Sequence, residues 1–148
     1  MILPDFKAFP PVGRILGIDW GLRRIGVAVS DPGRDFVFAR DVVAVPQGAD
    51  AAQIIASHAQ KEQVVGIVIG LPVRSDGTES DTTKKVRDFA DALARVVSVP
   101  IVFVEENLTS FAAQEDMGRV RVTELKKRLD SESARVILEN AIAIINRG

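Results

Sequence analysis

The chain has 148 residues, of which 47% are hydrophobic and 26% charged, and a formal net charge of −1. This composition is typical of a globular protein, and the length fits a single domain, which we expect to span residues 1–148. The absence of cysteine excludes disulfides, thiolate nucleophiles and Cys-based zinc sites. No apolar run approaches the ~20 residues that cross a bilayer, and the N-terminal eleven residues do not resemble a secretory signal, so we expect a cytoplasmic protein that does not bind membranes.

The first third of the chain predicts three antiparallel strands. Apolar residues over 15–19 and 25–30 flank a tight turn at 21–24 and indicate a hairpin. Asp31-Pro32-Gly33 is typical of the next turn, and 36–45 predicts the third strand. Together these elements would form an antiparallel meander.

From residue 47 the pattern alternates between helices and strands. Residues 51–62 and 81–97 have helical composition, whereas 64–69 and 101–104 are short β-branched runs of the kind that a parallel sheet buries on both faces. The sequence between 71 and 79 reads as a loop.

The last part of the chain predicts a short helix over 110–117, a basic segment over 118–129 and a closing helix over 131–145. The whole order indicates an α/β fold. It predicts a mixed five-stranded sheet, a three-strand antiparallel meander plus two parallel strands, flanked by helices.

Two of the apolar strands deliver a carboxylate to their ends. Asp19 follows the first strand, and Glu105 and Glu106 follow the strand at 101–104. A charge buried without a partner is costly, so acids at the ends of core strands usually face a cation or a hydrogen-bond network. A metal site is the first hypothesis; a turn cap at Asp19 and a solvated strand end at Glu106 are the alternatives.

Four motifs follow one another in the order Asp19-Trp20-Gly21-x-x-Arg24-Ile25-Gly26, Gly70-Leu71-Pro72-x-x-x-Asp76-Gly77-Thr78-Glu79, Glu105-Glu106-Asn107-Leu108-Thr109 and Asp130-x-x-Ser133-Ala134. In that order they resemble the YqgF/RuvX family. Its members are small bacterial proteins of RNase H-like fold, described as Holliday-junction resolvases and as nucleases that trim pre-16S ribosomal RNA. The chain departs from the family pattern at Asn107, where the family has Arg, and at Ser133, where it has Ala.

The resemblance implies that Asp19, Glu106 and Asp130 form the acidic triad of an RNase H-like nuclease. Successive strand side chains point to opposite faces, so only one of Glu105 and Glu106 can face Asp19, and the family pattern selects Glu106. We expect Asp130 to begin the closing helix, where an N-cap is the alternative role. The triad would hold Mg²⁺ or Mn²⁺, as two ions, because these cations prefer oxygen ligands.

A net charge of −1 provides no global attraction for a polyanion, so nucleic-acid binding would depend on local basic clusters. A short basic cluster is more often a solvated surface than a binding site. One such cluster consists of Lys84, Lys85 and Arg87. The residues that we expect to bind nucleic acid are Arg23, Arg24, Arg74, Lys84, Lys126, Lys127 and Arg128.

The resemblance to the YqgF/RuvX family implies a metal-dependent nuclease that hydrolyses phosphodiester bonds of nucleic acid, with the 5′ end of pre-16S rRNA as the favoured substrate. A Holliday junction resolvase-like endonuclease acting on branched DNA is one alternative. A non-cleaving RNA-binding factor for ribosome maturation is another, which Asn107 and the weak net charge favour. Actin-like ATPases share the core and its first loop, but they need two such domains, and 148 residues provide only one. The oligomeric state stays open.

Overall fold

A computed structural model describes residues 1–74, 76–107 and 122–147, apart from the side chains of residue 107 and of residues 122–131. The strands are β1 (Ile2–Leu3), β2 (Ile15–Asp19), β3 (Arg24–Ser30), β4 (Val37–Ala39), β5 (Val43–Ala44), β6 (Gly66–Val73) and β7 (Ile101–Asn107). The helices are α1 (Ala51–Glu62), α2 (Asp81–Val96) and α4 (Val122–Arg147). Within this part of the chain, no helix is long and apolar enough to cross a membrane.

The strands form one mixed sheet in the order β1-β7-β6-β2-β3-β4, with β5 also paired to β3. β1, β7, β6 and β2 are parallel neighbours, whereas β3 runs antiparallel to β2, β4 and β5. The predicted combination of an antiparallel meander with parallel strands is confirmed. The described sheet has seven strands instead of five, because β1 adds an edge strand and the predicted third strand is divided into β4 and β5.

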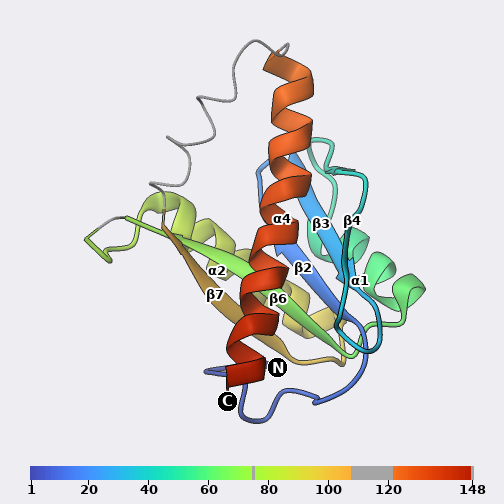
Figure 1. Cartoon of the computed structure of the whole chain (residues 1–148). Helices are drawn as coiled ribbons and strands as arrows, with labels where there is room; N and C mark the ends of the chain where they lie inside the picture. The colour runs from blue at the N-terminus through green and yellow to red at the C-terminus, as the bar shows by residue number, and fades with distance from the viewer. Residues whose placement is uncertain (75, 108–121, 148) are drawn as a thin grey trace.

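Helices cover both faces of the sheet (Figure 1). α4 lies across one face, and α1 and α2 lie against the other. Residues alternate between two cores along each central strand: Ile15 packs in the α4 core, whereas Leu16 and Ile18 pack in the core under α1 and α2. This burial on both faces explains why β2, β6 and β7 are nearly continuous apolar runs.

Gly17 allows α4 to approach the sheet closely. A Cβ atom at this position would lie 2.8 Å from Cβ of Leu138 and 3.1 Å from the backbone oxygen of Ala134. Any side chain at position 17 would therefore push α4 away from β2. The glycine sets the distance between the helix and the strand that carries Asp19.

The predicted third strand over 36–45 is interrupted after Ala39. Ala28 of β3 pairs with Ala39, but Ile25 pairs with Val43, so three steps along β3 correspond to four along the other strand. One extra residue of this kind is a β-bulge, which bends the strand and breaks the regular ladder. Alternating hydrophobicity does not reveal a bulge, because the apolar pattern resumes on the far side.

Helix α1 has the bounds that the sequence predicts, and α2 ends one residue before its predicted end. The predicted strands over 64–69 and 101–104 are displaced or too short: β6 starts at Gly66 and continues to Val73, and β7 continues to Asn107. Residues 71–73 are therefore strand, and the loop begins at Arg74. Glu106 lies inside β7 and not beyond its end.

The closing helix begins at Val122, nine residues before the predicted start at Ser131. Asp130 therefore lies inside α4, and the prediction that it begins or caps this helix is wrong. The segment from Val122 to Asp130 contains neither Gly nor Pro and is rich in Leu, Lys, Arg and Glu, which favour helix. The short helix predicted over 110–117 lies outside the described residues.

Candidate metal and nucleic-acid site

The predicted acids Asp19 and Glu106 come from strands on either side of β6. β2 pairs with β6 in parallel, and β6 pairs with β7 in parallel, so the carboxyl ends of all three meet at one edge of the sheet. Asp19 is the last residue of β2, and Glu106 is aligned with Pro72, one residue before the end of β6. This edge of a parallel sheet is where α/β proteins usually bind ligands.

Both acids belong to the sheet face that α4 covers. Gly17 lies against α4, and Asp19 follows it by two residues along the same strand. Val102 and Val104 pack in the α4 core, so Glu106 continues that face while Glu105 is exposed on the other. The structure thus places Glu106, and not Glu105, on the face that Asp19 shares.

Gly70 leaves the space that the Glu106 carboxylate occupies. A Cβ atom at Gly70, on the intervening strand, would lie 2.8 Å from Oε2 of Glu106 and would also collide with Cδ1 of Ile137 on α4. The register continues from the pair between Ile18 and Ile69, which puts Gly70 level with Asp19. In the sequence, Gly70 is recognisable only as part of a motif. Its neighbours in the chain do not indicate that it leaves space for the Glu106 carboxylate.

Burial perturbs the carboxyl group of Glu106. Desolvation raises its pKa to about 7, and no hydrogen bond or charge from a described residue opposes this effect. A divalent cation beside the group would favour its ionised form and replace the water that burial removes. A carboxylate is also the ligand type that Mg²⁺ and Mn²⁺ prefer, so the donor at this position fits such an ion.

Asp130 lies on α4 one helical turn before Ala134, whose backbone oxygen lies close to Gly17. Figure 1 shows that α4 ends beside the N-terminus of the chain, and β1, at that terminus, pairs with the first residues of β7. The helix therefore runs away from the carboxyl ends of the strands, and its earlier turns lie toward the edge that carries Asp19 and Glu106. The side chains of Asp130, Lys126, Lys127 and Arg128 are outside the described part of the chain. Among the side chains that are described, no group of three or more His, Cys, Asp or Glu residues is placed to hold a metal ion.

Four of the predicted basic residues lie near the same edge. Arg23 is exposed in the turn between β2 and β3, Arg74 is exposed directly after β6, and Lys84 is exposed in the first turn of α2. Arg24 is different, because it is half-buried and its buried Nη1 atom has no hydrogen-bond partner among the described residues. Alternation along β3, where Ile25, Val27 and Val29 face the opposite core, puts Arg24 on the α4 face with Asp19.

Arg87 has contacts that give it a structural role. Its guanidinium forms an ion pair with Glu79 and lies 5.5 Å from the ring centroid of Phe103. These contacts hold the Arg87 guanidinium against the protein surface. Lys84 and Lys85 have exposed side chains. Of the three basic residues in this cluster, the two lysines are exposed and the arginine is bound to Glu79 and Phe103.

The loop after β6 is held to the start of α2. Thr83, which is fully buried, donates a hydrogen bond from Oγ1 to the backbone oxygen of Pro72 at 2.5 Å, and it forms a capping box with Ser80. Asp76 accepts hydrogen bonds from the hydroxyl and backbone N–H of Thr78, and these bonds lower its pKa. These hydrogen bonds show that Asp76 stabilises the turn that contains it.

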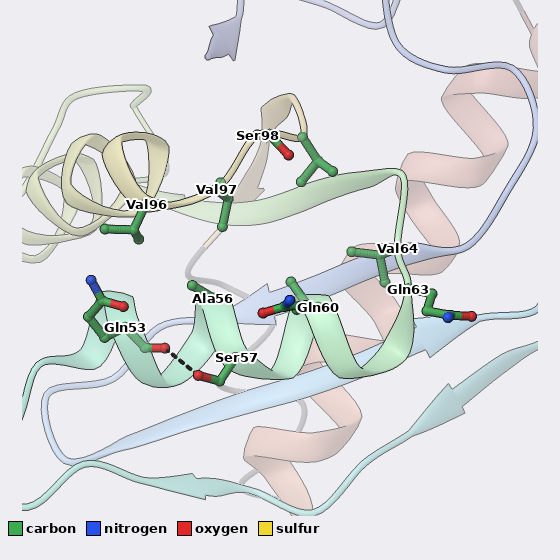
Figure 2. A pocket seen from close by; sticks show the side chains of 11 residues that line it. Gln53, Ala56, Ser57, Gln60, Gln63, Val64, Val96, Val97 and Ser98 are labelled. Atoms are coloured by element: carbon green, nitrogen blue, oxygen red, sulfur yellow. Dashed lines mark hydrogen bonds between the residues drawn. The ribbon is translucent and has the colours of Figure 1, made fainter.

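A separate pocket of about 350 Å³ lies between α1 and the segment after α2 (Figure 2). It is lined by polar uncharged and small apolar side chains, among them Gln53, Ser57, Gln60 and Ser98. Val64 and Val99, which also line it, precede β6 and β7, so it lies at the amino ends of these strands. With no charged lining residue and at the opposite end of the sheet, it is not part of the carboxylate site.

Comparison with known proteins identifies relatives over nearly the whole chain. The model of a family described as "RuvX: Holliday junction resolvase" matches residues 13–143. A protein of Maridesulfovibrio salexigens named "Putative pre-16S rRNA nuclease" is 38% identical over 132 residues, which cover 88% of this chain and 98% of that protein. One of the same name from Rhizobium meliloti is 37% identical over 139 residues, covering 92% and 84% of the two chains.

Among solved structures, the chain is similar to RuvC of T. thermophilus in complex with a Holliday junction substrate. The TM-score is 0.51 at 14% identity, and the match covers 90% of this chain and 94% of the other. At this identity the similarity concerns the fold, and it agrees with the predicted RNase H-like architecture.

Proposed function

Since the chain belongs to the RuvX family, we propose that it is a nuclease that hydrolyses phosphodiester bonds of nucleic acid, and that its substrate is the 5′ end of pre-16S rRNA. The names of the relatives from Maridesulfovibrio salexigens and Rhizobium meliloti support this choice of substrate. Without cysteine in the chain, the reducing cytoplasm, where ribosomal RNA is processed, is the proposed location.

We propose Asp19, Glu106 and Asp130 as the ligands of two Mg²⁺ or Mn²⁺ ions. The observation that carries this proposal is the placement of Asp19 and Glu106 on one face, at the shared carboxyl edge of β2, β6 and β7. The position of the Asp130 backbone, one turn from the helix segment that contacts Gly17, supports its inclusion. When bound, such ions activate a water molecule and stabilise the attacking and leaving oxygens of a phosphodiester.

The role proposed for Arg24 is to hold a phosphate of the substrate. Alternation along β3 puts Arg24 on the face of Asp19, and within the part of the chain that the structure describes its buried Nη1 atom has no hydrogen-bond partner. Arg can donate two parallel hydrogen bonds to a phosphate, which would satisfy this atom when substrate is present. Arg23, Arg74 and Lys84 are proposed to contact the backbone farther from the cut, because their side chains are exposed at the same edge.

The test is cleavage of an RNA that carries the pre-16S 5′ leader, in buffer containing Mn²⁺. We expect Asp19→Asn and Glu106→Gln to abolish cleavage while the circular dichroism spectrum is unchanged. Glu105→Gln is the matched control, because Glu105 is adjacent in sequence but exposed on the other face, and it should cleave at the rate of the unmodified protein. Equal loss of activity in the control, or activity retained in either of the first two variants, would contradict the proposed site.

A second candidate is cleavage of branched DNA, which the description of the matching family favours. The same variants should be assayed on a four-way DNA junction. Cleavage of the junction, with no cleavage of the leader RNA, would replace the RNA substrate by DNA. Metal-independent RNA binding without cleavage of either substrate would favour the binding-factor alternative.

A further inference from the structure

An apolar groove lies beside the carboxylate edge, on the face opposite to Asp19. Trp20 follows Asp19 directly and packs partly against the core under α1 and α2, so the two side chains point to opposite faces of the sheet. Trp20 lines two hollows of about 270 Å³ and about 460 Å³, and Leu22, Ala49 and Ala51 line both as well. We call these two adjacent hollows together the Trp20 groove.

The Trp20 groove contains apolar side-chain surface that stays exposed in the folded protein. Leu22 is 63% exposed, although it lines the same hollow as the half-buried Trp20 and Phe89 of α2. Single exposed apolar residues are common, but an aromatic and an aliphatic side chain around one hollow are typical of a binding surface. Because Trp20 follows Asp19 directly in the chain, the groove lies beside the proposed active site, on the other face of the sheet.

The charges around the groove are balanced. Arg23 and Lys85 supply two positive groups, and Asp50 and Asp88 supply two negative ones. Asp50 caps α1, because its side chain accepts a hydrogen bond from the backbone of Gln53 at 3.2 Å. Because the charges around the groove cancel, the groove has no net electrostatic attraction for several phosphates. An uncharged base can enter it while its phosphate stays outside, near Arg23.

We propose that the Trp20 groove binds an unpaired nucleobase of the substrate strand, stacked on the indole ring of Trp20, next to the phosphate on which the Asp19 edge acts. This inference rests on the proposed function and adds to it that the substrate is single-stranded at the cut. Bases within a duplex are paired and stacked on each other, so only an unpaired base can enter such a groove. Stacking on an aromatic ring depends little on base identity, so we expect weak sequence preference.

The composition of the chain makes the contact directly observable. Trp20 is the only tryptophan, and the chain has no tyrosine, so indole fluorescence reports on this side chain alone. The protein is titrated in EDTA, which prevents cleavage, with a single-stranded RNA of about eight nucleotides, within the range of a single binding groove. We expect saturable quenching by the single strand and little quenching by a fully paired duplex of the same sequence.

Variants separate the groove from general binding. Trp20→Leu and Leu22→Ser should weaken the affinity for the single strand about tenfold, measured by anisotropy of a labelled strand, whereas Trp20→Phe should retain most of it. Phe36→Leu is the matched control, because Phe36 is 66% exposed but does not line the groove. Trp20 is partly packed in the core, so Leu22→Ser, at an exposed position, decides the result if Trp20→Leu fails to fold.

The inference is wrong if the single strand binds without quenching, if single strand and duplex quench equally, or if Leu22→Ser binds as the unmodified protein does. Emission that depends on protein concentration without nucleic acid would show that a second copy of the chain fills the groove, and it would also overturn the inference. Failure of the nuclease proposal would differ, because Asp19→Asn cleavage assays test it independently of quenching. Cleavage that requires Asp19, with no signal from Trp20, would refute the groove alone.

Discussion

The replacement of Glu106 by glutamine should remove a large part of the pH dependence of stability. In the folded protein the pKa of Glu106 is raised from 4.5 to about 7, so the folded state binds this proton more tightly than the unfolded state does. The free energy of unfolding therefore falls as pH rises from about 4.5 to about 7, and stays low above that, when a buried carboxylate remains ionised. At about 1.4 kcal/mol per pKa unit, the rise of about 2.5 units corresponds to a loss of about 3.5 kcal/mol.

Glu106→Gln should lack this loss because its amide is neutral at every pH. The measurement is urea unfolding, followed by the emission of Trp20, at about pH 5 and about pH 8 in EDTA. The difference between the two pH values is the quantity to compare, since the buried amide adds a cost that does not vary with pH. Glu105→Gln, whose carboxylate is exposed, should keep the pH dependence of the unmodified protein. If Glu106→Gln also keeps it, the buried carboxylate is not the cause and the reasoning fails.

Three further predictions concern neighbouring contacts. Gly17→Ala should lower the free energy of unfolding by about 1–3 kcal/mol in thermal or urea unfolding, because its Cβ would meet Leu138 at 2.8 Å; an unchanged value would mean that α4 shifts without cost. Thr83→Val should cost about 1–3 kcal/mol by the same measurement, since it removes the hydrogen bond that the fully buried Thr83 hydroxyl donates to the backbone oxygen of Pro72. Arg24→Met should weaken RNA affinity and reduce the slope of log K against log salt by about one without lowering stability; a destabilised variant would show that Arg24 is structural.

The sequence predicted well those elements whose signals are local. Helix α1 has its predicted bounds because Asp50 caps its first turn and Gln63 adopts the left-handed conformation after its last residue. The start of α4 was missed because Asp130 and Ser131 resemble an N-cap, although the helix formers before them continue the helix without interruption. The end of β6 was missed because Pro72 suggests a loop, yet a proline can occupy a strand where its nitrogen is not required as a donor.

The candidate site was predictable in part. Strand periodicity separates Glu105 from Glu106, since the two must face opposite sides, and the structure puts Glu106 on the face of Asp19. The role of Gly70 was not predictable, because the atoms that a side chain would meet come from Glu106 on β7 and Ile137 on α4, both distant in sequence. The perturbed pKa of Glu106 has the same origin, as burial depends on the packing of α4 against the sheet.

The connection between β2 and β3 carries both the proposed metal ligand Asp19 and the proposed base-stacking residue Trp20. Asp19 pairs with Gly26, and a side chain at Gly21 would collide with the backbone oxygen of Arg24, so this turn closes only around a glycine. Asp19 and Trp20 lie on opposite faces of the sheet. A nucleic-acid strand with a phosphate at Asp19 and a base against Trp20 therefore has to cross the edge of the sheet. Under the inference above, a strand with unpaired bases would reach both side chains, and the choice of substrate would then depend on the same turn that holds Asp19 in position.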